Sequence, residues 1–319
     1  MIRIALLLMA MVVVPAATAQ SYPNRPIRVI VTFPPGGTPD IYGRIMAAEL
    51  QKIWNQPLVV ENRTGAAGTI GTDYVTKAAP DGYTLLFGAD APLTLAPWLY
   101  TKLPYDPLKD FTPIVNVTSG PFVLLAHPSF KANNVRELIE LAKAQPGKIA
   151  YASSGAGTQQ HLSMETVRAL AGIDVLHIPY KGFGQGLADV LANQVPLVFG
   201  GITASISLIK SGKVKGLGVT SAQRAKSLPE IPSFAESGLP GFDIQAWYGF
   251  VGPAGLPPEI VRKIHADSVQ VIQRPDFLER LARDGLEPVG NTPAAFAAQI
   301  RADIERWRPI VKAAGVKPE

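Results

Sequence analysis

Two turns in the chain have residue types that could bind a small anion. The first covers residues 33–40, FPPGGTPD, and the second covers residues 153–158, SSGAGT. Each follows a short apolar run and precedes a segment with helical character, which predicts a strand, a turn and then a helix. The start of a helix offers free N–H groups and the positive end of a dipole, and both favour an anion. One such turn is as often structural as functional, but two of them indicate recognition of an anionic group.

The first turn places backbone donors where a ligand could reach them. Gly36 and Gly37 carry no Cβ, so an anion could approach the backbone closely. Thr38 is predicted to be the N-cap of the helix, with Pro39 at the first helical position and Asp40 in the first turn. We interpret Asp40 as a helix-start carboxylate rather than as a ligand contact.

The second turn adds hydroxyl donors to the backbone N–H groups. They belong to Ser153, Ser154 and Thr158. In open α/β sheets, ligands bind beyond the carboxyl ends of the strands. We therefore expect the two turns, one in each domain, to face each other across a cleft and hold one anionic group. Lys181 could supply a cation to this cleft or lie on the surface, and the sequence leaves both possibilities open.

The same region permits other chemistry that the patterns favour less. Ser153 or Ser154 could act with His161 as the nucleophile of an exported hydrolase, but no G-x-S-x-G surrounds either serine. Gly155 and Gly157 have the spacing of the first two glycines of a dinucleotide fingerprint, but the third glycine is missing. The four histidines show no metal-ligand spacing and are interpreted as structural. We therefore predict no catalytic residue, no metal and no cofactor.

The start of the chain predicts export to the periplasm. Residues 1–19 read as a cleaved signal peptide, with Arg3 as a basic start, an apolar run over residues 4–14 and an Ala-Thr-Ala cleavage site at residues 17–19. The run is too short to span a bilayer. The chain has no cysteine, so neither disulfides nor a lipid anchor on cysteine is expected. The net charge of +5 comes from scattered residues, which argues against nucleic-acid binding.

The elements that must position the two turns alternate between strand and helix. This alternation predicts an α/β fold with parallel sheets and helices on their faces. Two extended stretches, residues 111–126 and 244–251, look like crossings between two domains, and Gly120-Pro121 is expected to break the first. We predict domain 1 as residues 20–122 plus 246–319, and an inserted domain 2 as residues 123–245. The other predicted strands are residues 27–33, 57–61, 83–87, 149–153, 175–179, 195–199 and 217–220.

Several motifs, taken in order, resemble the substrate-binding receptors of the tripartite tricarboxylate transporter family, the Bug-type receptors. The resemblance covers nearly the whole chain after residue 19. It rests on residues 33–40, 81–86 (DGYTLL), 151–162, 179–182 (PYKG), 238–241 (GLPG), Trp247 and 252–255 (GPAG). Such receptors have a fold similar to type II periplasmic binding proteins, in which two α/β domains joined by two crossing strands close on a ligand.

The resemblance implies a receptor, likewise without catalysis, that captures a small carboxylate and delivers it to the membrane permease subunits of a transporter. The protein would be a monomer. Presentation of the ligand to a membrane sensor kinase is an alternative that the sequence does not separate from transport. The residues expected to bind the carboxylate are Phe33, Pro35, Gly36, Gly37, Asp90, Ser153, Ser154, Gly157, Thr158 and Gly201. Glycines at positions 200–201, where the family often has a larger polar residue, are expected to affect which acid is preferred.

Overall fold

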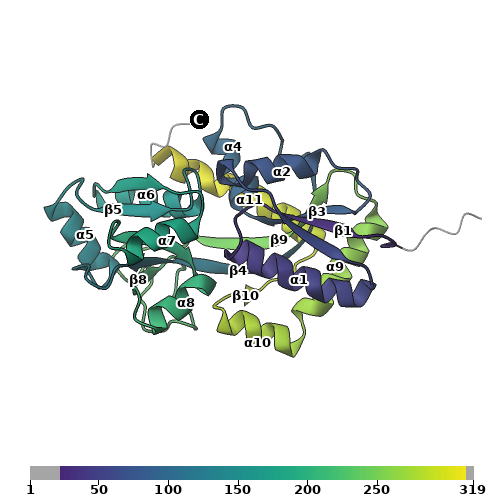
Figure 1. Cartoon of the computed structure of the whole chain (residues 1–319). Coiled ribbons are helices and arrows are strands. Elements are labelled where there is room, and N and C mark those ends of the chain that lie inside the picture. Colours follow the sequence, from purple (N-terminus) through teal and green to yellow (C-terminus); the bar gives the residue numbers. More distant parts are fainter. Residues whose placement is uncertain (1–21, 314–319) are drawn as a thin grey trace, which may run out of the picture.

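The computed structural model describes residues 22–313, so the predicted signal peptide lies outside the described residues. Figure 1 shows two groups of elements side by side, with β4 and β9 running between them. One mixed sheet connects the groups in the strand order β2-β1-β3-β9-β4-β7-β5-β6, and β8 and β10 also pair with β4. The fold is therefore α/β, as the alternation of elements predicts. The strands are β1 (Ile27–Val31), β2 (Leu58–Asn62), β3 (Thr84–Ala89), β4 (Phe111–Ala126), β5 (Ala150–Ser153), β6 (Leu176–Pro179), β7 (Leu197–Gly201), β8 (Lys215–Val219), β9 (Gln245–Pro253) and β10 (Glu287–Pro288).

Parallel pairing is confined to the two ends of this sheet. Strand β1 runs parallel to β2 and β3, and β5 runs parallel to β6 and β7. The pairs that join the two ends, β3 with β9, β9 with β4 and β4 with β7, are all antiparallel. We call β1, β2, β3 and β10 the first strand group, and β5, β6, β7 and β8 the second strand group. Both groups share β4 and only the first pairs directly with β9.

Helices cover the faces of the sheet because both faces of its central strands are apolar. In β1, Val29 and Val31 pack into one hydrophobic cluster, whereas Ile30 between them packs into a second cluster with Phe296 and Ile300. A strand buried on both faces has this nearly continuous apolar sequence. The main helices are α1 (Thr38–Trp54), α2 (Thr69–Thr76), α5 (Val135–Ala144), α6 (Gln159–Ala171), α7 (Phe183–Leu191), α8 (Ile202–Lys210), α9 (Pro258–Ile272), α10 (Pro275–Arg283) and α11 (Pro293–Ala313).

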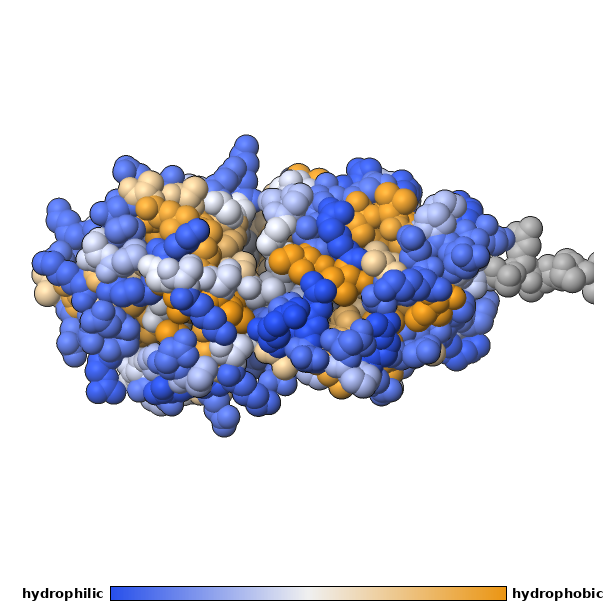
Figure 2. Space-filling model, turned by 60° about the horizontal axis from the view of Figure 1, so that its bottom comes forward, coloured by the Kyte–Doolittle hydropathy of each residue, from blue (hydrophilic) through white to orange (hydrophobic). Residues whose placement is uncertain are grey.

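The outer surface is mostly hydrophilic. Figure 2 shows apolar residues in separate patches on both halves of the molecule, with hydrophilic residues between them. Within residues 22–313, no helix combines the length and apolar character needed to cross a bilayer. The same residues contain no cluster of three acidic, histidine or cysteine side chains suited to a metal ion.

Two local expectations were wrong. Gly120-Pro121 does not break the crossing strand, because both residues pair with β9 and the register shifts occur earlier, at residues 113–118. Thr38 is not the N-cap of α1; the helix begins at Thr38 and Gly37 takes the cap position. Two short helices, α3 (Ala91–Thr94) and α4 (Ala96–Leu99), and the two-residue strand β10 were not expected.

The crossing of β4 and β9 depends on a glycine. A Cβ at Gly249 would lie 2.4 Å from the Val115 carbonyl oxygen and 2.9 Å from the Asn116 Cα, both of them backbone atoms. These atoms can move only if the strands separate, so there is no room for a side chain at this position. Gly184, at the start of α7, has nothing within 4 Å of the corresponding position.

We predict opposite effects of alanine at these two glycines. Gly249→Ala should lower the free energy of unfolding by about 1–3 kcal/mol, because it forces an overpacked contact between the crossing strands. Gly184→Ala should raise it by less than about 1 kcal/mol, because alanine costs less backbone entropy in a helix. Urea denaturation of both variants measures the difference. Equal stability of the two variants would contradict the steric account of the crossing.

Candidate functional site

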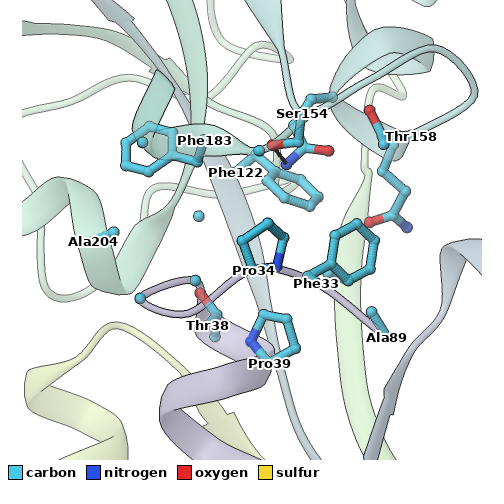
Figure 3. A pocket seen from close by; sticks show the side chains of 18 of the residues that line it. Phe33, Pro34, Thr38, Pro39, Ala89, Phe122, Ser154, Thr158, Phe183 and Ala204 are labelled. Atoms are coloured by element: carbon cyan, nitrogen blue, oxygen red, sulfur yellow. Dashed lines mark hydrogen bonds between the residues drawn. The ribbon is translucent and has the colours of Figure 1, made fainter. Parts of the chain in front are cut away.

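A pocket of about 580 Å³ lies where the two turns approach each other. Figure 3 shows Phe33 and Pro34 of the first turn beside Phe122, with Ser154 beyond them and Phe183 and Ala204 to one side. The walls come from seven separate stretches of chain, and most of the lining surface is apolar. The lining residues that the sequence pointed to are Phe33, Pro35, Gly36, Gly37, Asp90, Ser154, Thr158 and Gly201. A volume of this size is in the range of small-molecule sites.

The first turn is fixed by Asp40. Its Oδ2 accepts a hydrogen bond of 3.1 Å from the Gly36 N–H, and its Oδ1 accepts bonds from Arg44 (3.0 Å) and Asn62 (2.8 Å). Burial acts to raise the pKa of Asp40, but these hydrogen bonds hold it below its ordinary value. Asp40 is thus a helix-start carboxylate that shapes the turn, as interpreted from the sequence.

This arrangement changes which backbone donors the turn can offer. The Gly36 N–H, an expected anion donor, is already bound to Asp40. Among the described residues, the N–H groups of Gly37 and Thr38 donate no hydrogen bond of ordinary geometry. These two groups are at the N-terminus of α1, so the helix dipole reinforces them as donors to an anion.

The second turn is held mainly by its own hydroxyls. Thr158 donates its hydroxyl proton to the Gly155 carbonyl (2.8 Å) and its Oγ1 is the N-cap of α6. Ser154 differs, because its Oγ accepts a 3.2 Å bond from Gln160 while no described residue accepts its proton. Ser154 is therefore the hydroxyl of this turn that remains able to donate to a ligand.

Two expected site residues do not line the pocket. Ser153 is 1% exposed, and its Oγ lies 2.7 Å from His177 Nε2 and 3.0 Å from the Gly155 carbonyl oxygen. Gly157 faces Leu99, whose Cδ1 would lie 2.9 Å from a Cβ at that position. Both residues support the turn from behind. The pairing of Ser153 with His161, weighed for a hydrolase, is wrong because Ser153 contacts His177 instead.

A stacked pair of histidines lies behind the turn. The rings of His161 and His177 are 4.0 Å apart and nearly parallel, and His161 Nδ1 accepts the Gly157 N–H at 3.1 Å. Burial lowers the pKa of His161 to about 4. Burial and the neighbouring His161 lower the pKa of His177 to about 3. Both rings are therefore neutral at neutral pH, and the bond to Gly157 requires an unprotonated Nδ1.

Asp90 and Gln159 form a buried contact across the pocket. Asp90 directly follows β3 of the first strand group, and Gln159 begins α6, the helix that follows β5 of the second strand group. Gln159 Nε2 donates to Asp90 Oδ2 and, at 3.2 Å, to the Gln245 carbonyl. Burial raises the pKa of Asp90 well above its ordinary value, and the nearby carboxyl of Asp303 adds to the effect.

Other lining residues were not singled out as binding residues from the sequence. Gln159 and Gln160 directly follow the second turn, so their proximity in sequence was the available signal. Lys181, left open above, does line the pocket and is the one basic side chain in the wall within the described residues. The remaining unanticipated wall residues include Phe122, Phe183, Leu187, Leu208 and Tyr248, which the fold brings together from distant parts of the chain.

An α/β protein with a ligand-sized pocket between strand groups linked by two crossing strands has the architecture of a periplasmic binding protein. The structure of the periplasmic binding protein BugD superposes with a TM-score of 0.88 at 36% identity, over 93% of this chain and 100% of that one. R. palustris Rpa4515, solved with adipate, gives a TM-score of 0.90 at 32% identity, over 93% and 100% of the two chains.

Sequence comparison gives the family. Protein BugT of Bordetella pertussis (strain Tohama I) is 37% identical over 301 residues, which cover 94% of this chain and 92% of BugT. Residues 42–316 match the family described as tripartite tricarboxylate transporter family receptor. The chain therefore belongs to this receptor family, as its motifs indicate.

The histidine pair predicts acid sensitivity. Unfolded histidines take up protons near pH 6.5, whereas His161 and His177 in the folded protein do so only near pH 4 and 3. The unfolded state therefore binds more protons between pH 6.5 and 4, so stability should fall as the pH falls through this window. In the double variant His161→Gln/His177→Gln, the fall in stability with pH should be smaller, because up to two fewer protons are taken up on unfolding. The measurement is the change in Tm between pH 7 and pH 5.

His127→Gln serves as the control, because His127 lies outside the stacked pair and pairs with Ser129. It should keep the pH dependence of the unchanged protein. An identical change in Tm for the double variant and the control would show that the histidine pair does not cause the acid sensitivity.

Proposed function

We propose that the protein is a periplasmic receptor that binds a small carboxylate in the pocket and delivers it to the membrane subunits of a tripartite transporter. The observation that carries this proposal is the convergence of hydrogen-bond donors on one pocket within the described residues. These donors are the N–H groups of Gly37 and Thr38 and the hydroxyl of Ser154, with Lys181 also in the wall. Membership of the receptor family supports delivery to a transporter.

The apolar walls support a ligand with a hydrocarbon body. Phe122, Phe183, Leu187 and Leu208 line the pocket, and such surface favours contact with aliphatic or aromatic groups. Rpa4515, with a similar fold, was solved with adipate, a carboxylate with a four-carbon methylene chain. A small organic acid of this kind fits both the size and the character of the pocket.

We propose that binding occurs without chemical change. Ser153 contacts a histidine and is in this respect the better candidate for a nucleophile, but it is buried behind the turn and outside the pocket wall. Ser154 is in the wall, but its described partner is Gln160, which is no base. A nucleophilic serine needs a base within hydrogen-bond reach.

The pocket is also complete within one chain, which supports a monomeric receptor.

We propose that the two strand groups belong to two domains, residues 20–122 plus 246–319 and residues 123–245, that close on the ligand. Contacts across the pocket support this division. A Cβ at Gly182 would lie 3.0 Å from Pro34 Cγ, and one at Gly201 would lie 2.7 Å from Thr38 Oγ1. Strands β4 and β9 supply the chain connections between the two strand groups.

A screen of small carboxylates tests the proposed function, and a serine variant tests the site. A ligand at about 100 times its Kd should stabilise the protein by roughly 2.7 kcal/mol in a thermal-shift assay. Ser154→Ala removes a hydrogen bond to a charged group, worth about 1.5–3 kcal/mol, so it should weaken binding by roughly 10- to 150-fold in calorimetric titration. Its Tm without ligand should barely change.

Ser153→Ala provides the matched control, because it removes the neighbouring hydroxyl from behind the turn. It should lower Tm, since it leaves His177 and the Gly155 N–H without their partner. No thermal shift with any mono-, di- or tricarboxylate at millimolar concentration would exclude the organic-acid proposal. Unchanged affinity in Ser154→Ala, with the fold intact, would exclude this turn as the carboxylate site.

Domain closure predicts a change of size on binding. Small-angle scattering should show a smaller radius of gyration at saturating ligand than without ligand, because β4 and β9 act as the hinge between the two strand groups. An unchanged radius of gyration at saturation would contradict the proposal that the domains close.

A further inference from the structure

We infer that Gln160 is a positioning residue that makes the Ser154 hydroxyl a donor toward the ligand, so that the site selects a carboxylate over the carboxamide of the same shape. The inference rests on the proposed function, because it assigns to one residue the preference of the same pocket for a charged group. Gln160 belongs to α6 rather than to either turn.

The start of α6 places the amide of Gln160 beside the second turn. Gln160 is the second residue of the helix, whose N-cap is Thr158. Side chains on a helix lean toward its N-terminus, so the Gln160 side chain points back to the turn that precedes the helix. Its Nε2 donates to Ser154 Oγ at 3.2 Å, and both residues line the pocket. The two side chains therefore form one hydrogen-bonded pair in the pocket wall.

This bond sets the direction of the Ser154 hydroxyl proton. A hydroxyl has one proton and two lone pairs. The Gln160 amide N–H occupies one lone pair and repels the hydroxyl proton, so the proton points away from Gln160. Within residues 22–313, the Ser154 hydroxyl donates no hydrogen bond. A ligand acceptor would complete a chain from Gln160 through Ser154, and in such a chain each hydrogen bond polarises and strengthens the next.

A carboxylate fits this arrangement better than a carboxamide does. The N–H groups of Gly37 and Thr38 at the start of α1 are also donors, so both turns offer donors to the ligand. A carboxylate accepts at both oxygens, whereas a carboxamide accepts at one oxygen and carries N–H groups in place of the other. Those N–H groups would face a donor, and the remaining bonds to the neutral amide would lack the strength that charge gives them.

Calorimetric titration with matched acids and amides tests the inference. The probes are hexanoate and hexanamide, benzoate and benzamide, and adipate and adipamide. The unchanged protein should bind at least one acid about 10- to 100-fold more tightly than its amide, the range for a hydrogen bond to a charged group. In Gln160→Glu this ratio should fall to about 3-fold or less. The introduced carboxylate accepts the Ser154 proton and leaves the Ser154 oxygen as an acceptor, which weakens binding of the acid and favours the amide.

Gln185→Glu is the matched control for charge alone. It adds the same charge to the wall of the same pocket, and its carboxylate can still accept the Lys181 N–H that Gln185 Oε1 accepts at 3.2 Å. It should change the ratio by less than about 3-fold, because exposed charges are screened. Gln160→Glu should keep its Tm without ligand, because an acidic residue in the first turn of a helix is favourable.

Gln160→Met separates positioning from direct contact with the ligand. It removes the amide at similar volume, so it should weaken acid binding by about 3- to 10-fold, the range for one hydrogen bond. Combined with Ser154→Ala, it should cause a further loss of less than about 2-fold, because the hydroxyl through which it acts is gone.

Four results would overturn the inference alone. They are an acid preference retained in Gln160→Glu, an equal loss of preference in Gln185→Glu, a full effect of Gln160→Met on top of Ser154→Ala, and failure of all three acids to bind. Failure of every acid in the wider carboxylate screen would overturn the proposed function as well.

Discussion

The antiparallel pairing of β4 with β9 is the constraint on which the rest of the structure depends. These strands lie at the centre of the strand order, so the first and second strand groups are both built outward from them. They approach closely enough that Gly249 presses against the backbone of Val115 and Asn116. Because the pocket lies between segments from both sides of this crossing, the geometry of the site follows from the geometry of two strands.

The proposed carboxylate site can favour an anion with little formal charge of its own. Its donors are backbone N–H groups at a helix start and a serine hydroxyl, and they are held in place by groups that do not contact the pocket directly. Asp40 fixes the first turn through the Gly36 N–H, and the His161–His177 pair fixes the second through Gly157 and Ser153. Neutral, fixed donors avoid the cost of burying a lysine or arginine when the site is empty.

The features that depend on residues close together in the sequence could be predicted from it. Asp40 is the helix-start carboxylate that its position in the sequence indicates, and the apolar runs before the two turns form the strands β1 and β5. Both turns fall where strand and helix signals meet. The direction of Ser153 could not be predicted, because it depends on His177, 24 residues away in a different strand. The apolar pocket wall could not be predicted either, because Phe122 and Leu208 come to line the same pocket only after the crossing strands fold.

The small residues that face each other across the pocket have a consequence for affinity that does not involve the ligand. Gly182 meets Pro34, and Gly201 meets Thr38, at distances that leave no space for a side chain. In the proposed closure of the two domains, a larger residue at Gly182 or Gly201 would collide with Pro34 or Thr38 and reduce the fraction of closed molecules. Apparent affinity scales with that fraction. Substitutions at these glycines would therefore shift the range of ligand concentration over which the receptor responds.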